Sequence, residues 1–168
     1  MKTRQALRLL ICAMAISTGG CALMGSGPSP AERLANDLSG MIWPLPIDRA
    51  ALVTSPYGVR GNRHHDGLDI SGNGGDPIYA AQSGTVVFEG WMNGYGNAII
   101  IDHGNGVTTL YGHASQLFVT DGQRVARGEV IGAVGATGNA TGNHVHFEVA
   151  WAGVAIDPRQ MLPALSFR

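Results

Sequence analysis

The residues with the clearest chemical potential are two histidines, His144 and His146, that flank Val145. Side chains alternate between the two faces of a β-strand, so a strand here would place both imidazoles on one open face and Val145 in the core. Neutral imidazole is the commonest protein ligand for zinc. An isolated pair of this kind is weak evidence, because histidines at this spacing are often structural or simply exposed. The pair predicts a metal site only if further ligands exist.

Further ligands occur much earlier in the chain. His65 and Asp69 are separated by three residues, and they share one face if that stretch is extended. A third element is His113, which follows Tyr111 and Gly112. Together these groups predict a metal site built from nitrogen and oxygen donors. Thiolate ligands are not expected, because both cysteines lie near the N-terminus, outside the segments that carry the histidines.

Composition favours a small β-rich domain. The 168 residues suit a single domain with one core once a targeting segment is removed. The 25 glycines are about twice the average share, which favours frequent turns and short strands over helices. A net charge of −1 with 14% charged residues provides no basic surface for nucleic acid, so no nucleic-acid partner is expected.

The first residues have the organisation of an export signal. Lys2, Arg4 and Arg8 form a positive end, Leu9 to Ile16 is apolar, and small residues follow up to Gly20. The apolar run is too short to span a bilayer. We therefore predict a signal peptide over residues 1–20 and an exported protein.

The segment Thr18-Gly19-Gly20-Cys21 resembles the lipobox of bacterial lipoproteins, although Thr18 stands where a leucine-like residue is usual. The resemblance implies that Cys21 is the first mature residue and that it is acylated, which would anchor the protein in a membrane. Ala22, rather than Asp, implies the periplasmic side of the outer membrane of a Gram-negative cell. The alternative is a plain secretory signal in which Cys21 is incidental.

Residues 21–40 are predicted to hold the lipidated cysteine, a flexible tether and a short helix. Ser29 would cap this helix, apolar residues from Ala31 to Leu38 recur at helical spacing, and Gly40 would end it. So short a helix is marginal alone in water, so we expect it to pack on the domain. A lid over the site is the other possibility.

Residues 41–168 are predicted to form a mainly β domain. Ile42 to Pro46 suits a sheet edge, because its two prolines cannot donate to a ladder, and Asp102 to Gly106 suits a hairpin loop. The expected fold is a set of antiparallel sheets, arranged as a β-sandwich or roll with the site on one concave face. The predicted strands are Leu52–Ser55, Gly67–Ile70, Thr85–Trp91, Ala98–Asp102, Val107–Tyr111, Glu129–Val134 and His144–Ala150.

Ordered motifs across this domain give the chain a family resemblance. From about Trp43 to about Pro158 it resembles the LytM and lysostaphin-like zinc metallopeptidases, which cut peptide bridges of peptidoglycan. The resemblance implies the fold of that family, with an open groove and duplicated hybrid motifs. The motifs are Thr54–Arg60, His65–Ile70, Pro77–Ala81, Gly84–Val87, Gly94–Asn97, Ile101–Ser115, Thr137–Asn139 and His144–Glu148.

Carried over position by position, the resemblance makes His65, Asp69 and His146 the ligands of one Zn²⁺ ion, and His113 and His144 the catalytic pair. Two imidazoles and a carboxylate leave a tetrahedral zinc with one open position for water, as in catalytic sites. We expect His144 to act as general base and His113 to orient water or stabilise the oxyanion, although the two roles are interchangeable at this stage.

Arg60 is the nearest strong donor before the first ligand, where some family members use a tyrosine. It is a candidate for the oxyanion or for a substrate carboxylate, and a plain surface role is the alternative.

Several other polar residues are weaker candidates. His64 is out of register with Asp69 and should face away from the site. His103 suits a turn or a supporting position. Glu148 would lie on the same strand face as His144 and His146, so it either supports one of them by a hydrogen bond or faces solvent. The aromatic residues Trp91, Tyr95 and Trp151 are expected to pack or to line the groove.

The resemblance implies a zinc endopeptidase that hydrolyses peptidoglycan cross-links, and a Gram-negative lipoprotein would be expected to cut the bond from D-alanine to meso-diaminopimelate. An alternative is a non-catalytic relative that activates cell-wall amidases, but all five site positions are filled here. A second alternative is a phosphocarrier or biotinyl-like binding module, which residues 121–132 resemble. The export signal argues against such a cytoplasmic protein.

Overall fold

The computed structural model describes residues 40–46 and 53–164. Within these ranges the chain is antiparallel β-structure with one short 3-10 helix, η2 (Pro158–Gln160), and no α-helix. The prediction of a mainly β, antiparallel fold is therefore confirmed. The predicted signal peptide, Cys21 and the helix before Gly40 lie outside the described residues. No helix in the described part of the chain is long and apolar enough to cross a membrane.

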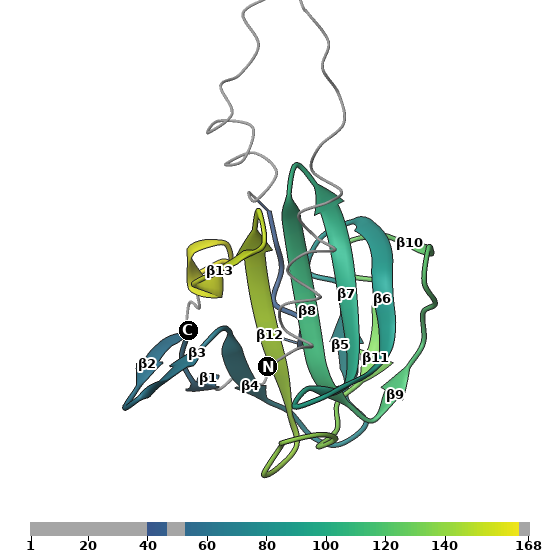
Figure 1. Ribbon diagram of the computed structural model, residues 1–168. Helices are drawn as coiled ribbons and strands as arrows, with labels where there is room; N and C mark the ends of the chain where they lie inside the picture. Colours follow the sequence, from purple (N-terminus) through teal and green to yellow (C-terminus); the bar gives the residue numbers. More distant parts are fainter. Residues whose placement is uncertain (1–39, 47–52, 165–168) are drawn as a thin grey trace, which may run out of the picture.

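One large antiparallel sheet forms the body of the domain (Figure 1). In spatial order its strands are β1 (Val53–Ser55), β4 (Leu68–Ser71), β12 (His144–Trp151), β8 (Val107–Ala114), β7 (Gly96–Gly104), β6 (Gly84–Met92) and β10 (Arg124–Val125). The central strands β12, β8, β7 and β6 run side by side, and the smaller strand β13 (Val154–Ile156) pairs with β12.

Two smaller sheets complete the fold. One contains, in order, β5 (Pro77–Tyr79), β11 (Val130–Ala133) and β9 (Gln116–Leu117). The other is a hairpin of β2 (Gly58–Arg60) and β3 (Arg63–His65), which projects to one side of the large sheet in Figure 1. Every predicted strand is confirmed with small shifts at its ends, apart from Leu52, which is not described. The short strands β2, β3, β5, β9, β10 and β13 were not predicted, because two or three residues show no periodicity.

Strand β12 shows why the sequence separates core from site. Val145, Phe147 and Val149 are fully buried, and Phe147 packs on Tyr111 with 5.4 Å between ring centroids. Burying each such side chain stabilises the fold by roughly 1.5–3 kcal/mol. The same core receives residues from the second sheet, among them Ile78 and Ile131. By strand alternation, His144, His146 and Glu148 face the opposite side of the large sheet.

The segment before the first strand is bound along the edge of β5. Ile42 N–H donates to the carbonyl oxygen of Ala81, and Tyr79 N–H donates to that of Pro44, both at 2.9 Å. Trp43 is buried, and its indole N–H donates to the carbonyl oxygen of Pro163 at 3.0 Å. The prediction of an edge segment holds for its position, although the prolines prevent a regular strand here.

The predicted hairpin loop joins β7 to β8. Gly104, Asn105 and Gly106 all have positive φ angles, of 85°, 49° and 81°. Asp102 supports the turn by accepting the N–H of Gly104 at 2.9 Å. This left-handed backbone explains the Gly-Asn-Gly sequence, since these residues adopt it at least cost.

The glycine-rich run before β12 contains two positions, Gly135 and Gly138, that must be glycine for lack of space. A Cβ on Gly138 would lie 2.3 Å from Gly96 N. A Cβ on Gly135 would lie 2.5 Å from Ser115 N, whereas a Cβ on Gly142 would meet nothing within 4 Å. We expect Gly135→Ala to lower the free energy of unfolding by roughly 1–3 kcal/mol. The matched variant Gly142→Ala should change it by less than about 1 kcal/mol. Denaturant unfolding measures both, and equal stabilities would contradict the close approach.

His103 should make the stability of the fold sensitive to acid, independently of the candidate metal site. Its Nδ1–H donates to the carbonyl oxygen of Ser83 at 2.9 Å, and Nε2 lies 2.8 Å from Thr109 Oγ1. Burial lowers the pKa of His103 below 6.5. Because the unfolded chain then binds a proton more readily, stability should fall as the pH drops below about 6.5. His103→Gln should make this fall shallower in unfolding curves across pH 5 to 8, and an unchanged slope would contradict the assignment.

Candidate metal centre and adjoining histidines

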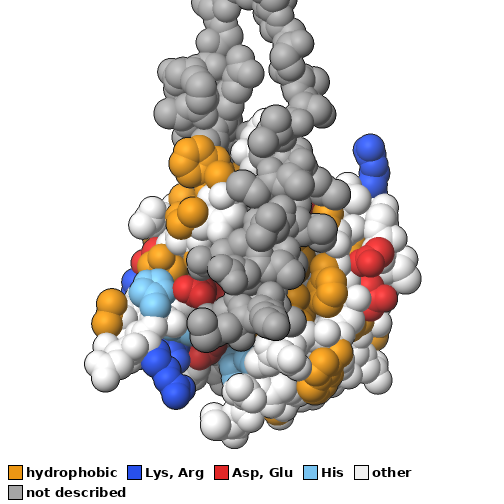
Figure 2. Space-filling model, viewed as in Figure 1, with side chains coloured by type: hydrophobic (Ala, Val, Ile, Leu, Met, Phe, Trp, Pro, Cys, Tyr) orange, Lys and Arg blue, Asp and Glu red, His pale blue; other side chains and the backbone are white. Residues whose placement is uncertain are grey.

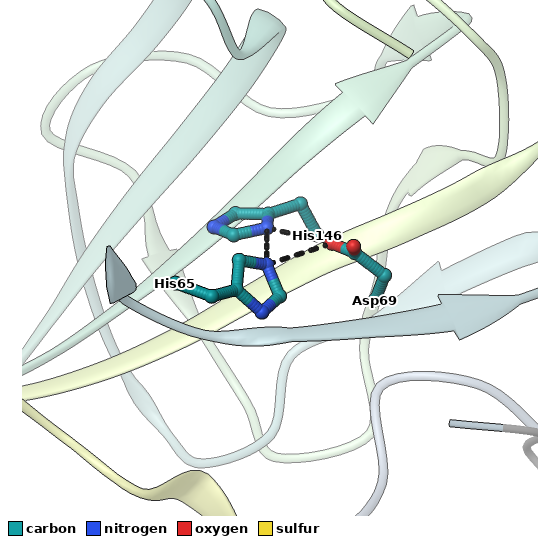
Figure 3. Close-up of side chains that lie close together, drawn as sticks. All are labelled: His65, Asp69 and His146. Carbon is teal, nitrogen blue, oxygen red and sulfur yellow. Dashed lines mark hydrogen bonds and ion pairs between the residues drawn. The ribbon is translucent and has the colours of Figure 1, made fainter. Parts of the chain in front are cut away.

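Three side chains from separate strands converge on one point. His65 ends β3, Asp69 lies in β4 and His146 lies in β12 directly opposite Asp69 in the ladder. His65 Nε2 and His146 Nδ1 lie 3.1 and 2.9 Å from Asp69 Oδ1, and the two nitrogens are 3.1 Å apart (Figure 3). Among the described residues they form the one group of histidine, cysteine and acidic side chains suited to hold a metal ion.

A turn, rather than a single extended strand, brings His65 to Asp69. The chain leaves β3 at His65, turns through Asp66 and Gly67, and enters β4 at Leu68. A Cβ on Gly67 would collide with the carbonyl oxygen of Phe147, so the turn must pass close to β12. His65 and Asp69 were expected to share a face if their stretch is extended. That condition is not met, because a turn separates them, but their side chains do converge.

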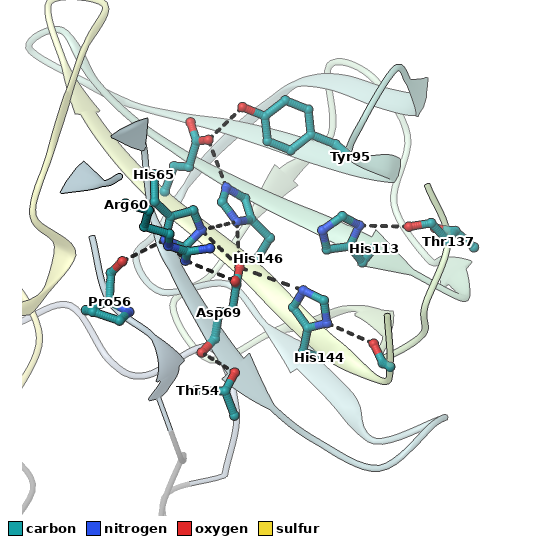
Figure 4. A network of polar contacts seen from close by, with 12 residues as sticks. Thr54, Pro56, Arg60, His65, Asp69, Tyr95, His113, Thr137, His144 and His146 are labelled. Atoms are coloured by element: carbon teal, nitrogen blue, oxygen red, sulfur yellow. Dashed lines mark hydrogen bonds and ion pairs between the residues drawn. The ribbon is translucent and has the colours of Figure 1, made fainter. Parts of the chain in front are cut away.

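Four histidines of the site each use the nitrogen that faces away from its centre in a hydrogen bond (Figure 4). In a neutral ring, an N–H fixed in this way leaves the other nitrogen with its lone pair toward the centre. The inward atoms are therefore Nε2 of His65, His113 and His144 and Nδ1 of His146. The outward bonds run from His65 Nδ1 to Pro56 O (2.8 Å), His113 Nδ1 to Thr137 O (2.7 Å), His144 Nδ1 to Gly142 O (2.8 Å) and His146 Nε2 to Glu148 Oε1 (2.9 Å).

His113 reaches the site through a local break in strand alternation. Regular alternation would send its side chain to the core face beside Tyr111, but His113 has a left-handed φ of 66°. The ring instead lies 4.6 Å from that of His144 and 5.9 Å from that of His146, centroid to centroid. Such a backbone conformation costs energy in a residue other than glycine, and it is typical of functional positions.

Glu148 supports His146 rather than facing solvent. Its Oε1 accepts both the Nε2–H of His146, at 2.9 Å, and the hydroxyl of Tyr95, at 2.7 Å. The sequence left open whether Glu148 supports a histidine or faces solvent, and the structure shows the supporting hydrogen bond. The bond to Tyr95 had no signal in the sequence, because Tyr95 lies in a turn far from Glu148 along the chain.

Arg60 and His64 occupy different places on the β2–β3 hairpin. Arg60 Nη2 lies 3.3 Å from Asp69 Oδ2 and also against His65 Nδ1. His64 points elsewhere, with Nδ1 at 2.9 Å from Asp66 Oδ1 and its ring against Tyr57. His103 lies apart from the candidate metal site, and its ring nitrogens bond to Ser83 and Thr109 instead. In Figure 2, histidine and acidic side chains lie together on the side of the molecule that carries this hairpin.

The electrostatics of the site favour a cation. Burial alone would raise the pKa of Asp69, but the hydrogen bond from His146 and nearby positive charge hold it well below its usual range. Burial opposes charge on His146, yet bonds to Asp69 and Glu148 raise its pKa to about 9. Burial lowers the pKa of both His65 and His113, which keeps these rings neutral. Two carboxylates around His146 thus create a position where positive charge is stabilised.

The donor set fits a zinc ion. Ligands placed tetrahedrally at roughly 2.0–2.1 Å from zinc lie about 3.3 Å apart, so the observed separations need only a slight widening. Two neutral imidazole nitrogens and one carboxylate oxygen are the ligand types of catalytic zinc sites. The hydrogen bond from His146 to Glu148 supplies the usual support behind such a ligand. When bound, such an ion acts as a Lewis acid that activates water and polarises a carbonyl group.

The fold and this site agree with the family comparison. The sequence model of peptidase family M23 matches residues 63–158, more than half of the chain, and the protein belongs to this family. The matched span includes the three converging residues together with His113 and His144, whereas Arg60 lies just before it. The resemblance to LytM and lysostaphin-like peptidases predicted from the motifs is confirmed.

Two relatives illustrate the range of the family. The DD-carboxypeptidase/endopeptidase Mpg of Neisseria meningitidis is 42% identical over 112 residues, which cover 63% of this chain and 26% of Mpg. The murein hydrolase activator NlpD of Escherichia coli is 34% identical over 122 residues, covering 72% of this chain and 31% of NlpD. The chain therefore corresponds to about a quarter to a third of the length of these relatives.

Solved structures show the same fold. The catalytic domain of lysostaphin from Staphylococcus simulans has a TM-score of 0.59 and 34% identity, covering 63% of this chain and 87% of that domain. A zinc-containing peptidase from Vibrio cholerae has a TM-score of 0.65 and 30% identity, covering 75% of this chain and 41% of that protein.

Zinc should stabilise the protein only when the three ligands are intact. At a free zinc concentration about 100 times the dissociation constant, binding to the folded state adds about 2.7 kcal/mol, so the melting temperature should rise by several degrees. His146→Ala should abolish this rise. His64→Ala, a change on the exposed hairpin beside His65, should preserve it. Calorimetry with and without a chelator measures the effect, and an equal rise in both variants would contradict the assigned ligands.

Proposed function

We propose that this protein is a zinc-dependent endopeptidase that hydrolyses the peptide cross-links of peptidoglycan during cell-wall remodelling. One observation carries the proposal: the imidazoles of His113 and His144 adjoin the convergent donors of His65, Asp69 and His146. The three donors would hold one Zn²⁺ ion, and the two further rings supply bases beside it. A purely structural zinc site needs four closed ligands and no adjoining bases.

His144 has the better position for the general base. Its Nε2 lies 3.7 Å from Asp69 Oδ1, so it stands beside the ligand set rather than within it. Its Nδ1–H is held by the carbonyl oxygen of Gly142, which leaves Nε2 ready to accept a proton from the attacking water. In the proposed reaction His144 then returns this proton to the leaving amine.

His113 and Arg60 would divide the remaining roles. Because the Nδ1–H of His113 is directed to Thr137 O and burial keeps the ring neutral, its Nε2 accepts a hydrogen bond and orients the water. A neutral ring in this tautomer has no N–H with which to stabilise an oxyanion. Arg60, with its side chain 42% exposed beside Asp69, has permanent donors for the developing negative charge.

The substrate and location follow from the family and from the N-terminal sequence. We propose that Cys21 is lipidated, that residues 21–40 tether the domain and that the protein acts at the periplasmic side of the outer membrane. The name of NlpD, a murein hydrolase activator, and that of Mpg, a DD-carboxypeptidase/endopeptidase, support peptidoglycan as the substrate. In a Gram-negative wall the proposed bond joins D-alanine to meso-diaminopimelate.

Similarity to NlpD also favours a second candidate, a non-catalytic activator of cell-wall amidases. An activator needs neither a metal nor bases, so its activity would survive His65→Ala. The complete set of donors and bases in this chain supports the enzyme instead.

Purified sacculi provide the test. The zinc-loaded protein should convert cross-linked muropeptide dimers to monomers, as measured by mass spectrometry of the digests, and a chelator should stop the reaction. His144→Ala and His113→Ala should each lower the rate roughly 10²–10⁴-fold while retaining bound zinc. His64→Ala should remain active.

Two outcomes would oppose the enzyme. Dimers that persist with zinc-loaded protein would contradict hydrolysis of cross-links. Sacculi that dissolve only when an amidase is added, equally well with His65→Ala, would identify the activator.

A further inference from the structure

We propose that Tyr95 is a positioning residue that holds the metal ligand His146 and the proposed water-orienting residue His113 in one rigid arrangement. The proposal rests on the zinc site proposed above, but not on the identity of the substrate. Tyr95 acts by two separate groups. Its hydroxyl reaches His146 through Glu148, and its backbone carbonyl binds His113 directly.

The hydroxyl of Tyr95 completes a relay behind the metal ligand. It donates to Glu148 Oε1 at 2.7 Å, and the same oxygen accepts the Nε2–H of His146 at 2.9 Å. A carboxylate free to rotate would hold the imidazole poorly, whereas one fixed by a phenol keeps the inward Nδ1 of His146 aimed at Asp69 and His65. Hydrogen bonds of this kind orient a ligand and increase its basicity. The side chain of Glu148 is only 13% exposed, so water competes little for it.

The ring of Tyr95 also packs against the ligand. Its centroid lies 5.3 Å from that of the His146 ring, at an interplanar angle of 57°. Gly112, opposite His146 in the ladder, leaves room for this contact. A Cβ on Gly112 would lie 3.3 Å from Tyr95 Cδ1 and 3.5 Å from His146 Cβ. Close packing of Tyr95 against His146 therefore explains why residue 112, between Tyr111 and His113, is a glycine.

The backbone of Tyr95 fixes the other half of the site. Its carbonyl oxygen accepts the N–H of His113 at 2.7 Å, which holds the left-handed residue in place. The turn that carries Tyr95 is also bound to the loop that orients the His113 ring. Asn139 N–H donates to Gly94 O at 2.9 Å, and Asn97 N–H donates to Thr137 Oγ1 at 3.0 Å. Thr137 O in turn accepts the Nδ1–H of His113. One turn therefore supports both the backbone and the ring of His113.

Tyr95→Phe isolates the hydroxyl, because the ring and the backbone carbonyl remain. We expect this variant to bind zinc roughly 10–100-fold more weakly than the wild type in competition with a chelator. In a Glu148→Ala background, the same substitution should have little further effect, because the hydroxyl acts through Glu148. The visible spectrum of the Co²⁺-loaded protein should shift in Tyr95→Phe, which a purely structural role would not cause.

Tyr111→Phe is the matched control. It removes a buried hydroxyl that is bonded to Thr109 and Ala81 on the core side of the sheet. It should lower the free energy of unfolding of the metal-free protein while leaving zinc affinity unchanged. Tyr95→Phe should show the opposite pattern, with metal-free unfolding close to that of the wild type.

The outcomes separate this inference from the proposed function. A zinc affinity for Tyr95→Phe within about threefold of the wild type would overturn it, since loss of an outer hydrogen bond of this kind typically lowers metal affinity roughly 10–100-fold. An equal loss in the Glu148→Ala background would also overturn it. Weaker zinc binding in Tyr95→Phe by a protein that leaves sacculi intact would support the inference and count against the enzyme. A wild type that binds no zinc would overturn both.

Discussion

The site depends on hydrogen bonds made by the far side of each imidazole. A histidine can present either nitrogen, and rotation or proton movement would turn a lone pair into a donor. Here carbonyl groups of Pro56, Thr137 and Gly142 and the carboxylate of Glu148 each bind one outward nitrogen. In a neutral ring the inward nitrogen is thereby fixed as the acceptor. At His146, where bonds to Asp69 and Glu148 raise the pKa to about 9, a metal ion would first displace the proton on Nδ1. The ring orientations need little further change on binding.

The elements that supply these acceptors explain why a small β-domain needs so many glycines and turns. Two of the carbonyls, those of Thr137 and Gly142, lie in the loop before β12, and the carbonyl of Pro56 lies between β1 and β2. These irregular segments approach the ordered strands closely, as the contact of Gly138 with Gly96, the first residue of β7, shows. The large sheet provides a rigid base with Phe147 and Tyr111 beneath it, and the loops complete the site from its edges. Functional groups on loops held by a rigid scaffold are a common arrangement.

Much of the fold and of the candidate metal site was predictable from the sequence. Strand β12 carries a clear alternation, so the core position of Phe147 and the shared face of His144 and His146 followed from period two. The motifs also related His65 and Asp69 to His146. The turn between His65 and Asp69 was missed because three-residue strands leave no pattern. The position of His113 contradicts simple alternation. The Tyr111-Gly112-His113 step and the family resemblance pointed to the site, but the backbone that brings the ring there was not predictable, because a left-handed φ at a residue other than glycine has no signal in a single sequence. The bond between Tyr95 and Glu148 joins distant segments and required the structure.

We propose that His65 Nε2, Asp69 Oδ1 and His146 Nδ1 hold one zinc ion beside His113 and His144. X-ray diffraction from crystals of the zinc-loaded protein, recorded on both sides of the zinc absorption edge, tests it most directly. We expect one anomalous peak at about 2.0–2.1 Å from these three atoms, with the ring of His144 nearby but unbound. A peak bonded to a different nitrogen or to other residues, or no peak in crystals grown with zinc, would contradict it.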